Sequence, residues 1–248
     1  MKDSYLLFLF QLFAHLSVIP FIMYASAYHY LLVIFVYFIT GCIGMTVTYH
    51  RLLSHSSWTS PKWFTYVGSI AGAYGLTGSP IAWVAVHREH HRHVDTEQDP
   101  HSPEHQGFIK VQWLSMFDKV NIKYASHLLR DKFQVFLHKN YFFLHVGILA
   151  FWMSIDPMLA LACYSVPAML LWNMGSFVNS LNHRFGYKNY ESRDSSRNLI
   201  FTGFLVWGEG WHNNHHAKPS SPTFKKMWWE LDVGNLIINL LKVKNEKK

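Results

Sequence analysis

The placement of charged residues constrains this chain more than any other feature. No Asp, Glu, Lys or Arg occurs from Ser4 to Tyr49, and between Lys139 and Arg184 the only one is Asp156. The core of a soluble protein of 248 residues cannot bury two such stretches. About 20 apolar residues in an α-helix, by contrast, cross the hydrocarbon layer of a bilayer. The sequence therefore predicts an integral membrane protein.

Four segments predict membrane-spanning helices, which pair into two hairpins. The stretch Ala25–Tyr28 separates the first pair, and Asp156–Pro157 separates the second because a polar residue before a proline favours a turn. We expect an all-α protein with a single domain, residues 1–248, whose segments 50–139 and 181–248 form a helical cap. The expected spans cover about residues 4–24, 29–49, 140–155 and 158–180.

The uncharged stretch Trp63–Val86 does not predict a fifth span. Four glycines and Pro80 interrupt it, and both residue types weaken a helix interior. If the stretch crossed the bilayer, His50 and His55 would lie on the opposite face from His87 and the histidines that follow it. We therefore expect a re-entrant or interfacial segment, which keeps all these histidines on one side.

The basic residues indicate which side that is. The net charge of +7 is compatible with a nucleic-acid binder, but residues 51–140 carry ten Lys or Arg and residues 184–248 carry eleven, so the charges flank the apolar segments. An excess of Lys and Arg beside spans marks the cytoplasmic side. We expect the cap to face the cytoplasm and to bind no nucleic acid. The tail, Phe224–Lys248, mixes apolar residues with lysines and predicts a basic surface helix.

Seventeen histidines are the most informative anomaly in the composition, and nine of them gather in four clusters at the predicted cytoplasmic boundary. Two clusters have the pattern His-x-x-His-His, whose members share one face of a helix. Random placement of this many histidines yields roughly 0.08 such triplets per chain. The clusters are His50 with His55, His87 with His90 and His91, Asn179 with His183, and His212 with His215 and His216.

These clusters predict a metal site. His50 and His55 lie roughly 140° apart on an ideal helix, so the helix must end or distort between them. Nine imidazoles exceed the four ligands of a tetrahedral zinc ion and fit two metals of higher coordination. Imidazole binds iron, copper and zinc alike, so the residues alone leave the metal open. Glu209 precedes His212 by three residues, and we expect it to orient a ligating imidazole, with a solvated turn residue as the alternative.

Five motifs, in a fixed order between about His50 and Trp229, give these clusters a family resemblance. They resemble the membrane fatty acid desaturases of the Δ9, stearoyl-CoA desaturase-like branch. The motifs are His50-Arg-Leu-Leu-Ser-His55, Trp83…His87-Arg-x-His90-His91, Asp99-Pro100-His101, Asn179-Ser…His183 and Gly208-Glu209-Gly210-Trp211-His212-Asn-Asn-His215-His216.

The resemblance implies a di-iron centre in a cytosolic cap and a role for each motif. Asn179 would contact a metal through water, and Asp99 and Glu209 would orient ligating imidazoles. The eight other histidines, His101 among them, are expected to have structural roles. The implied ligands are His50, His55, His87, His90, His91, His183, His212, His215 and His216.

The same resemblance implies the reaction. Two Fe ions would use O2 and two electrons to place a cis double bond, with Δ9 as the expected position, in a saturated C16–C18 acyl chain. A separate electron donor is implied, either ferredoxin or cytochrome b5 with its reductase. Alternatives within the superfamily are an alkane or lipid hydroxylase and a carotenoid or sterol oxidase. A metal transporter or sensor is the alternative from another class, although transporters place their ligands near the bilayer midplane.

The acyl carrier stays open between lipid, CoA and acyl carrier protein. Animal acyl-CoA enzymes of this family usually carry Arg-Asp where this chain has Ala85-Val86, and basic residues where it has His105-Gln106. Both differences remove cationic partners for a CoA phosphate. The surroundings of Trp83 are similar to those in bacterial and cyanobacterial acyl-lipid enzymes, which favours a bacterial inner membrane over the endoplasmic reticulum.

A tunnel for the acyl chain is expected along the second span. From His50, the ligand-side face of an ideal helix runs back through Thr46, then Cys42 or Ile43, to Phe38 or Ile39. We expect Phe38 and Cys42 to meet the methyl end of the chain, and Trp83 to line the tunnel near the metals. Simple packing between spans is the alternative for Phe38 and Cys42.

Overall fold

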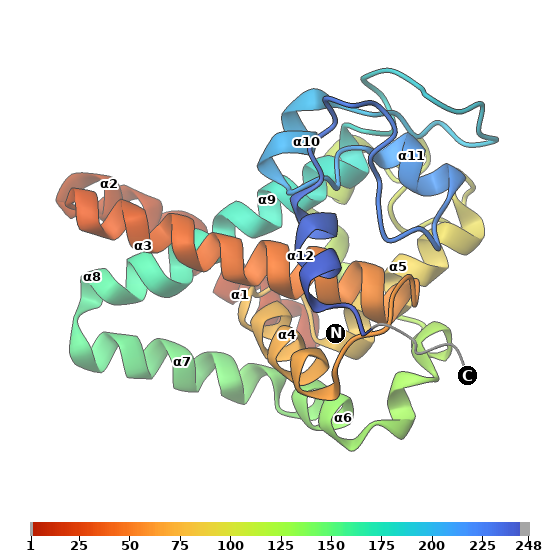
Figure 1. The fold of residues 1–248 in the computed structure, drawn as a ribbon. Coiled ribbons are helices and arrows are strands. Elements are labelled where there is room, and N and C mark those ends of the chain that lie inside the picture. The colour runs from red at the N-terminus through yellow and green to blue at the C-terminus, as the bar shows by residue number, and fades with distance from the viewer. Residues whose placement is uncertain (1, 244–248) are drawn as a thin grey trace.

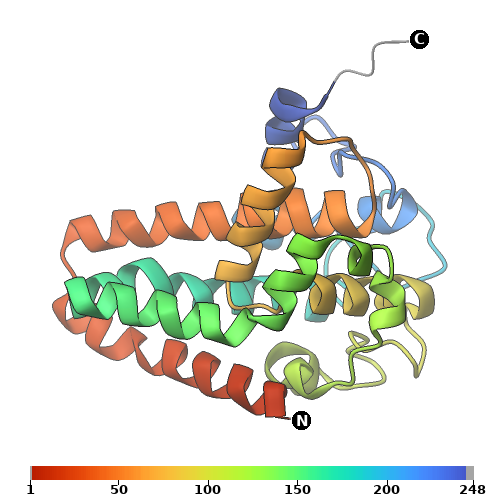
Figure 2. The ribbon, with the colours of Figure 1, turned by 90° about the horizontal axis from the view of Figure 1, so that it is seen from below.

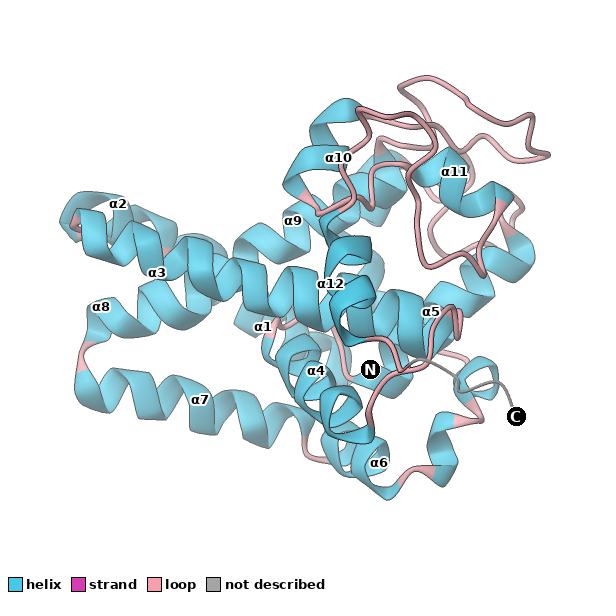
Figure 3. Cartoon of the chain, viewed as in Figure 1, coloured by secondary structure: helices cyan, strands magenta, loops and turns pink. Residues whose placement is uncertain are grey.

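A computed structural model describes residues 2–243, and within that range the regular elements are helices without strands. Long helices lie side by side in one half of the molecule, whereas short helices joined by long loops form the other half (Figures 1 and 3). The all-α architecture predicted from the sequence is confirmed for these residues.

Three of the four predicted spans are confirmed as apolar helices long enough to cross a membrane, at Asp3–Tyr24, Ala27–Ser54 and Pro157–Ser180. Each is built from consecutive elements. The first comprises α1 (Lys2–Leu16) and α2 (Val18–Tyr24), the second α3 (Ala27–Tyr37) and η1 (Phe38–Ser54), and the third α8 (Pro157–Ala160), η6 (Leu161–Ser165) and α9 (Val166–Ser180).

The remaining predicted span, α7 (Tyr141–Ile155), has 15 residues. At 1.5 Å per residue it is about 22 Å long, shorter than the roughly 30 Å hydrocarbon layer. It runs alongside the other long helices (Figure 2). The turn after it forms as predicted, because the Asp156 carboxylate accepts a hydrogen bond of 2.6 Å from the Met158 N–H and so caps α8.

The interrupted stretch Trp63–Val86 forms two helices, α4 (Lys62–Tyr74) and α5 (Pro80–His93). Neither is among the helices long and apolar enough to span. Glycines allow α4 to cross η1 closely, because a Cβ on Gly44 would lie 2.3 Å from the backbone nitrogen of Gly72. The break between α4 and α5 directs the histidines of α5 towards the end of η1.

The cap contains η2 (Lys110–Leu114), η3 (Ser115–Phe117), η4 (Ile122–Ala125), η5 (Leu128–Arg130), α6 (Lys132–Lys139), α10 (Ile200–Leu205), α11 (His212–Ala217) and α12 (Val233–Leu241). The predicted tail helix is shorter than expected. It begins at Val233, since the preceding residues from Phe224 form a loop with the Phe224 ring buried. Residues 244–248 of that prediction lie outside the described range. Leu236 and Leu240 of α12 are exposed, as a surface helix requires.

Candidate metal centre

The winding of η1 brings the first two histidines together. Its backbone follows i→i+5 hydrogen bonding, and the His55 N–H donates to the His50 carbonyl at 3.2 Å. A wider turn places residues five apart near one face, and the two imidazole centroids lie 5.0 Å apart. The distortion expected between His50 and His55 is therefore a change in helical winding.

The two His-x-x-His-His triplets lie on α5 and α11 and face the same interior. Each triplet divides between two groups of side chains. From α5, His87 and His91 join one group and His90 joins the other. From α11, His215 joins the first group, while His212 and His216 join the second.

All nine predicted histidines fall into these two groups, whose ligand atoms lie within 4.8 Å of one another inside each group. The Nε2 atoms of His55 and His87 are 2.8 Å apart, and those of His183 and His212 are 3.1 Å apart. Group one is His50, His55, His87, His91 and His215; group two is His90, His183, His212 and His216.

Carboxylates hold four of these imidazoles from behind. Glu209 accepts a short hydrogen bond from the Nδ1 of His50, and Asp99 accepts one of 2.9 Å from His90. These are the contacts that an orienting role for the two acids requires. Two further pairs, Asp95 with His183 and Asp194 with His216, have the same geometry at 3.1 Å.

A buried cation stabilises Glu209 in turn. Arg51 is fully buried, and its guanidinium lies 3.5 Å from Glu209 Oε1 and 2.8 Å from Asp232 Oδ1. The same group lies 3.9 Å above the Phe224 ring. Arg51 therefore ties the end of η1 to the loops on both sides of α11.

Burial and neighbouring groups shift the pKa values of several side chains in the site. Burial, reinforced by neighbouring imidazoles, lowers the pKa of His55 to about 2 and the pKa values of His87 and His215 well below 6.5. Burial alone would raise the pKa of Asp95, but hydrogen bonds from His183 and Ser195 outweigh it and hold that pKa well below its usual value. His55, His87 and His215 are therefore neutral, and Asp95 is ionised.

This donor set fits metal ions. A carboxylate that accepts from Nδ1–H leaves the lone pair on Nε2, and the Nε2 atoms of each group converge. Converging lone pairs repel one another unless a cation lies between them. In addition, the buried Nδ1 atoms of His212 and His215 have no hydrogen-bond partner among the described residues. Two groups of converging imidazoles, backed by four carboxylates, suit two cations.

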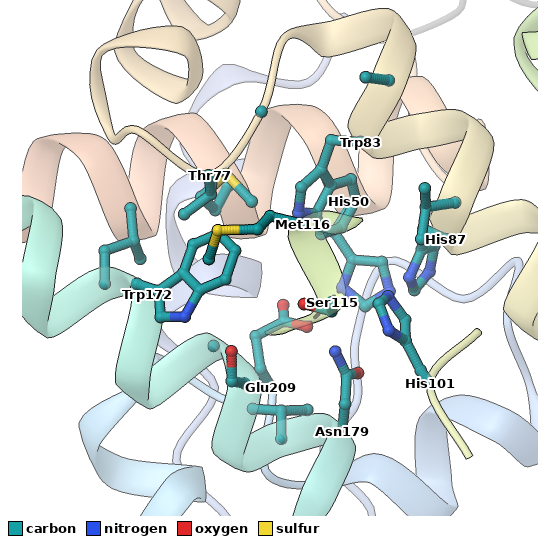
Figure 4. Close-up of a pocket in the computed structure, with 18 of the residues that line it drawn as sticks. His50, Thr77, Trp83, His87, His101, Ser115, Met116, Trp172, Asn179 and Glu209 are labelled. Carbon is teal, nitrogen blue, oxygen red and sulfur yellow. Dashed lines mark hydrogen bonds and ion pairs between the residues drawn. The ribbon is translucent and has the colours of Figure 1, made fainter. Parts of the chain in front are cut away.

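A cavity of about 200 Å³ lies against this site, and Figure 4 shows the side chains around it. His50, His87 and His212 contribute to its wall, and so do Asn179 and Glu209. The rest is largely apolar and comes from η1, α5, η3 and α9. Among these residues are Met45, Thr46, Ala82, Trp83, Val86, Met116, Leu171, Trp172, Gly175 and Val178.

Of the predicted tunnel residues, Trp83 lies on the cavity wall and stacks on His87 with ring centroids 4.9 Å apart. Cys42 instead packs, fully buried, in a core cluster with Leu171 and Trp207, and Phe38 packs against the same cluster. Neither is among the residues that line the cavity. Their role at the end of the acyl chain stays a prediction.

Sequence reasoning missed three residues of this site. Asp95 and Asp194 hold ligand imidazoles, but both lie in loops, where no helical spacing connects them to a histidine. His101 was assigned a structural role, yet it lines the cavity and its buried Nδ1 has no partner among the described residues. Its position two residues after Asp99 was the available signal.

Comparison with known proteins identifies the class to which this site belongs. The sequence profile of the family described as "Fatty acid desaturase" matches residues 25–232. The chain therefore belongs to the fatty acid desaturase family and is an oxidoreductase, as the resemblance predicted. This membership does not support the metal-transporter alternative.

Among individual relatives, the chain is 37% identical over 225 residues to the sn-2 palmitoyl-lipid 9-desaturase of Nostoc sp., covering 85% of this chain and 77% of the relative. It is 38% identical over 213 residues to the sn-1 stearoyl-lipid 9-desaturase of Synechocystis sp., with 83% and 66% covered. It is 34% identical over 219 residues to Delta-9 acyl-lipid desaturase 2 of Arabidopsis thaliana, with 85% and 71% covered.

Proposed function

We propose that this protein is a Δ9 acyl-lipid desaturase that places a cis double bond in a saturated C16–C18 chain. The observation that carries the proposal is the contact between two histidine groups and one largely apolar cavity. The names of the relatives from Nostoc and Synechocystis specify position 9 and a lipid carrier. The overall reaction balances as RCH2–CH2R′ + O2 + 2 e⁻ + 2 H⁺ → RCH=CHR′ + 2 H2O.

Two iron ions are the proposed occupants of the metal centre. The first would be held by His50, His55, His87, His91 and His215, and the second by His90, His183, His212 and His216. Bound iron would supply the activation of O2 that removal of hydrogen from an unactivated methylene pair requires. Asn179 reaches the cavity wall beside these groups, where its amide could hold a water molecule towards a metal.

The residues around the cavity would position the substrate and exclude bulk water. Trp83 and Trp172 form broad apolar walls, and Met45 and Thr46 close the side formed by η1. An extended acyl chain in contact with these side chains would pass beside His50, His87 and His212. The carboxylates behind the imidazoles would keep the ligand atoms in place while the chain binds and leaves.

A lipid carrier fits the surroundings better than CoA. Ala85 is fully buried and Val86 lines the cavity, so neither position offers a cation to a CoA phosphate. A membrane lipid already lies in the bilayer that the apolar helices occupy. We propose a bacterial inner membrane because the relatives from Nostoc and Synechocystis are bacterial. We propose that the active site faces the cytoplasm because basic segments flank the apolar spans.

Expression in a bacterial host that lacks unsaturated fatty acids tests this function. The expected products are Δ9 cis-unsaturated C16–C18 chains esterified in membrane lipids, together with about two iron ions per purified chain. A double bond at another position would contradict the Δ9 assignment. Hydroxylated chains without a double bond would contradict the desaturase reaction itself.

A further inference from the structure

The reaction consumes two electrons, so a reduced carrier must approach a metal centre whose ligands are buried or partly buried. One surface connected to those ligands lies over the loops that precede and follow α11. There, Tyr190 is flanked by two exposed lysines. Lys218 Nζ lies 5.2 Å and Lys226 Nζ lies 3.9 Å from the centre of the Tyr190 ring. We name this surface the Tyr190 patch; it comprises Lys188, Tyr190, Arg193, Lys218, Lys225 and Lys226.

The first connection from the Tyr190 patch leads to group one. Phe224 immediately precedes the exposed Lys225 and is itself buried. Its ring centre lies 4.4 Å from that of His215 and 5.3 Å from that of His50. A single aromatic side chain therefore separates this part of the surface from two imidazoles of group one.

The second connection leads to group two. Asp194 accepts a hydrogen bond from His216 Nδ1 at 3.1 Å, and its own backbone carbonyl accepts one of 2.8 Å from Lys188 Nζ. A third connection joins Tyr190 to α11, since its N–H donates to the Asn213 side chain at 2.8 Å. Asn213 follows the ligand His212 directly. Chains of contacts thus join both histidine groups to the same surface.

The charge of this surface indicates its partner. The segments 188–194 and 218–226 carry five basic residues (Lys188, Arg193, Lys218, Lys225 and Lys226) and two acidic ones (Glu191 and Asp194), and Asp194 is engaged by His216. A basic patch attracts an acidic surface, increases the rate of encounter and fixes the docked orientation. Figure 1 shows α11 and the loop before α10 at the end of the molecule opposite the turn between α7 and α8. The patch therefore faces away from the membrane that the long helices occupy.

We propose that the Tyr190 patch is the docking surface for a small soluble one-electron carrier with an acidic face around its redox centre. The inference rests on the proposed function, because only an enzyme that consumes electrons needs such a carrier. Two successive dockings would deliver the two electrons of each turnover, and each would oxidise one carrier by one electron. Phe224 and Asp194 would lie between the docked carrier and the two groups of imidazoles.

The experiment measures binding of an acidic ferredoxin to the full chain in phosphatidylcholine nanodiscs. The double variant Lys218→Glu/Lys226→Glu should weaken binding roughly tenfold or more, because each reversal sets like charges opposite one another. Wild-type affinity should also fall as salt is raised from about 0.05 to 0.3 M, since screening shortens the range of these charges. The matched control is Arg130→Glu/Lys132→Glu, which makes the same charge change at exposed residues at the end of η5 and the start of α6 and should leave affinity unchanged.

Three outcomes would overturn the proposal: equal affinity of wild type and double variant, equal loss in the control, or no dependence on salt. A fourth outcome concerns vesicles that contain phosphatidylglycerol in phosphatidylcholine. If the wild type binds these vesicles and the double variant does not, while both bind ferredoxin equally, the patch binds anionic lipid instead of the carrier. Lipid analysis of the expression host separates this failure from failure of the proposed function. Δ9 products without patch-dependent binding would overturn only the docking surface, whereas intact binding without any product would overturn the desaturase assignment.

Discussion

The Nδ1 atoms of His50, His90, His183 and His216 each donate to a carboxylate, so these four rings have one fixed tautomer and one fixed direction. Three of the four belong to group two, which makes that group the more dependent on its acids. Group one depends instead on packing, because His55, His87 and His91 contact one another and His87 also stacks on Trp83. We therefore expect removal of a carboxylate to weaken metal binding more in group two than in group one.

The first prediction concerns the acids of group two. Asp95→Asn and Asp194→Asn should each weaken metal binding by about 10- to 100-fold, because an amide no longer holds the Nδ1 proton with a full negative charge. Metal content after dialysis against a graded series of chelator concentrations measures this. The control is Glu97→Gln. Glu97 is exposed, lies two positions from both Asp95 and Asp99, and contacts no ligand imidazole. Unchanged metal retention in both aspartate variants would show that the acids do not support the site.

The second prediction concerns a ligand itself. His90→Ala removes one of four imidazoles from group two and leaves the five of group one, so bound iron should fall from about two ions per chain towards one, and turnover should be lost. Elemental analysis and product analysis of the same preparation measure both quantities. His29→Ala, a half-buried histidine in the first turn of α3 that belongs to neither group, serves as the control. Full iron content with full activity in His90→Ala would contradict the assignment of group two.

At the scale of elements, the sequence predicted the positions of the long helices and the nine histidines, because both depend on composition and local spacing. It placed the cavity wall on η1 only in part. The face of an ideal helix below His50 runs through Thr46, Cys42 and Phe38. Thr46 does line the cavity, but Met45 lines it in place of Cys42 and Phe38, because the wider i→i+5 winding changes which residues share a face. The sequence also did not predict that the loop residues Asp95 and Asp194 contact ligand imidazoles. Loop conformation depends on tertiary contacts, and the spacing of residues along the sequence does not reveal these.

The third prediction concerns α9, which forms one side of the cavity. A Cβ on Gly175 would meet no atom within 4 Å, and Gly175 lines the cavity, so Gly175→Leu should fill space that the acyl chain needs. Desaturation of C18 chains should fall about tenfold or more, with metal content retained, because leucine favours the helix more than glycine by nearly 1 kcal/mol. Comparison of C16 and C18 products measures the effect.

The matched control for that variant is Gly147→Leu on α7. Gly147 also has open space around its Cβ position, but it is exposed and lies outside the cavity lining. Both substitutions add the same side chain to an apolar helix. Equal C18 desaturation in the two variants would mean that the acyl chain does not pass Gly175.

At the scale of the whole molecule, the short helix α7 and the interrupted pair α4–α5 decide how the chain crosses the bilayer. Three crossings by the long apolar helices alone would place the two ends of the chain on opposite sides of the bilayer. With α7 as a further crossing, the residues after α9 lie on the side where η1 ends. The two histidine groups draw ligands from η1, α5, α11 and the residues after α9, so these segments must share one side. A crossing by α7, with local thinning of the bilayer or flanking side chains that reach the interface, satisfies that requirement.

The fourth prediction tests this topology with single cysteines introduced at Ser56, Ser126 and Ser220, which are all exposed, and at Asp156. The first three should react with an impermeant thiol reagent only from the cytoplasmic side, and Asp156→Cys only from the opposite side. Background labelling should be low, because the native Cys42 and Cys163 are both buried. Ser56→Cys and Ser126→Cys on different sides would mean that α4 and α5 together cross the bilayer. Asp156→Cys and Ser126→Cys on the same side would mean that α7 does not cross, and α9 would then carry His183 to the opposite face from His50.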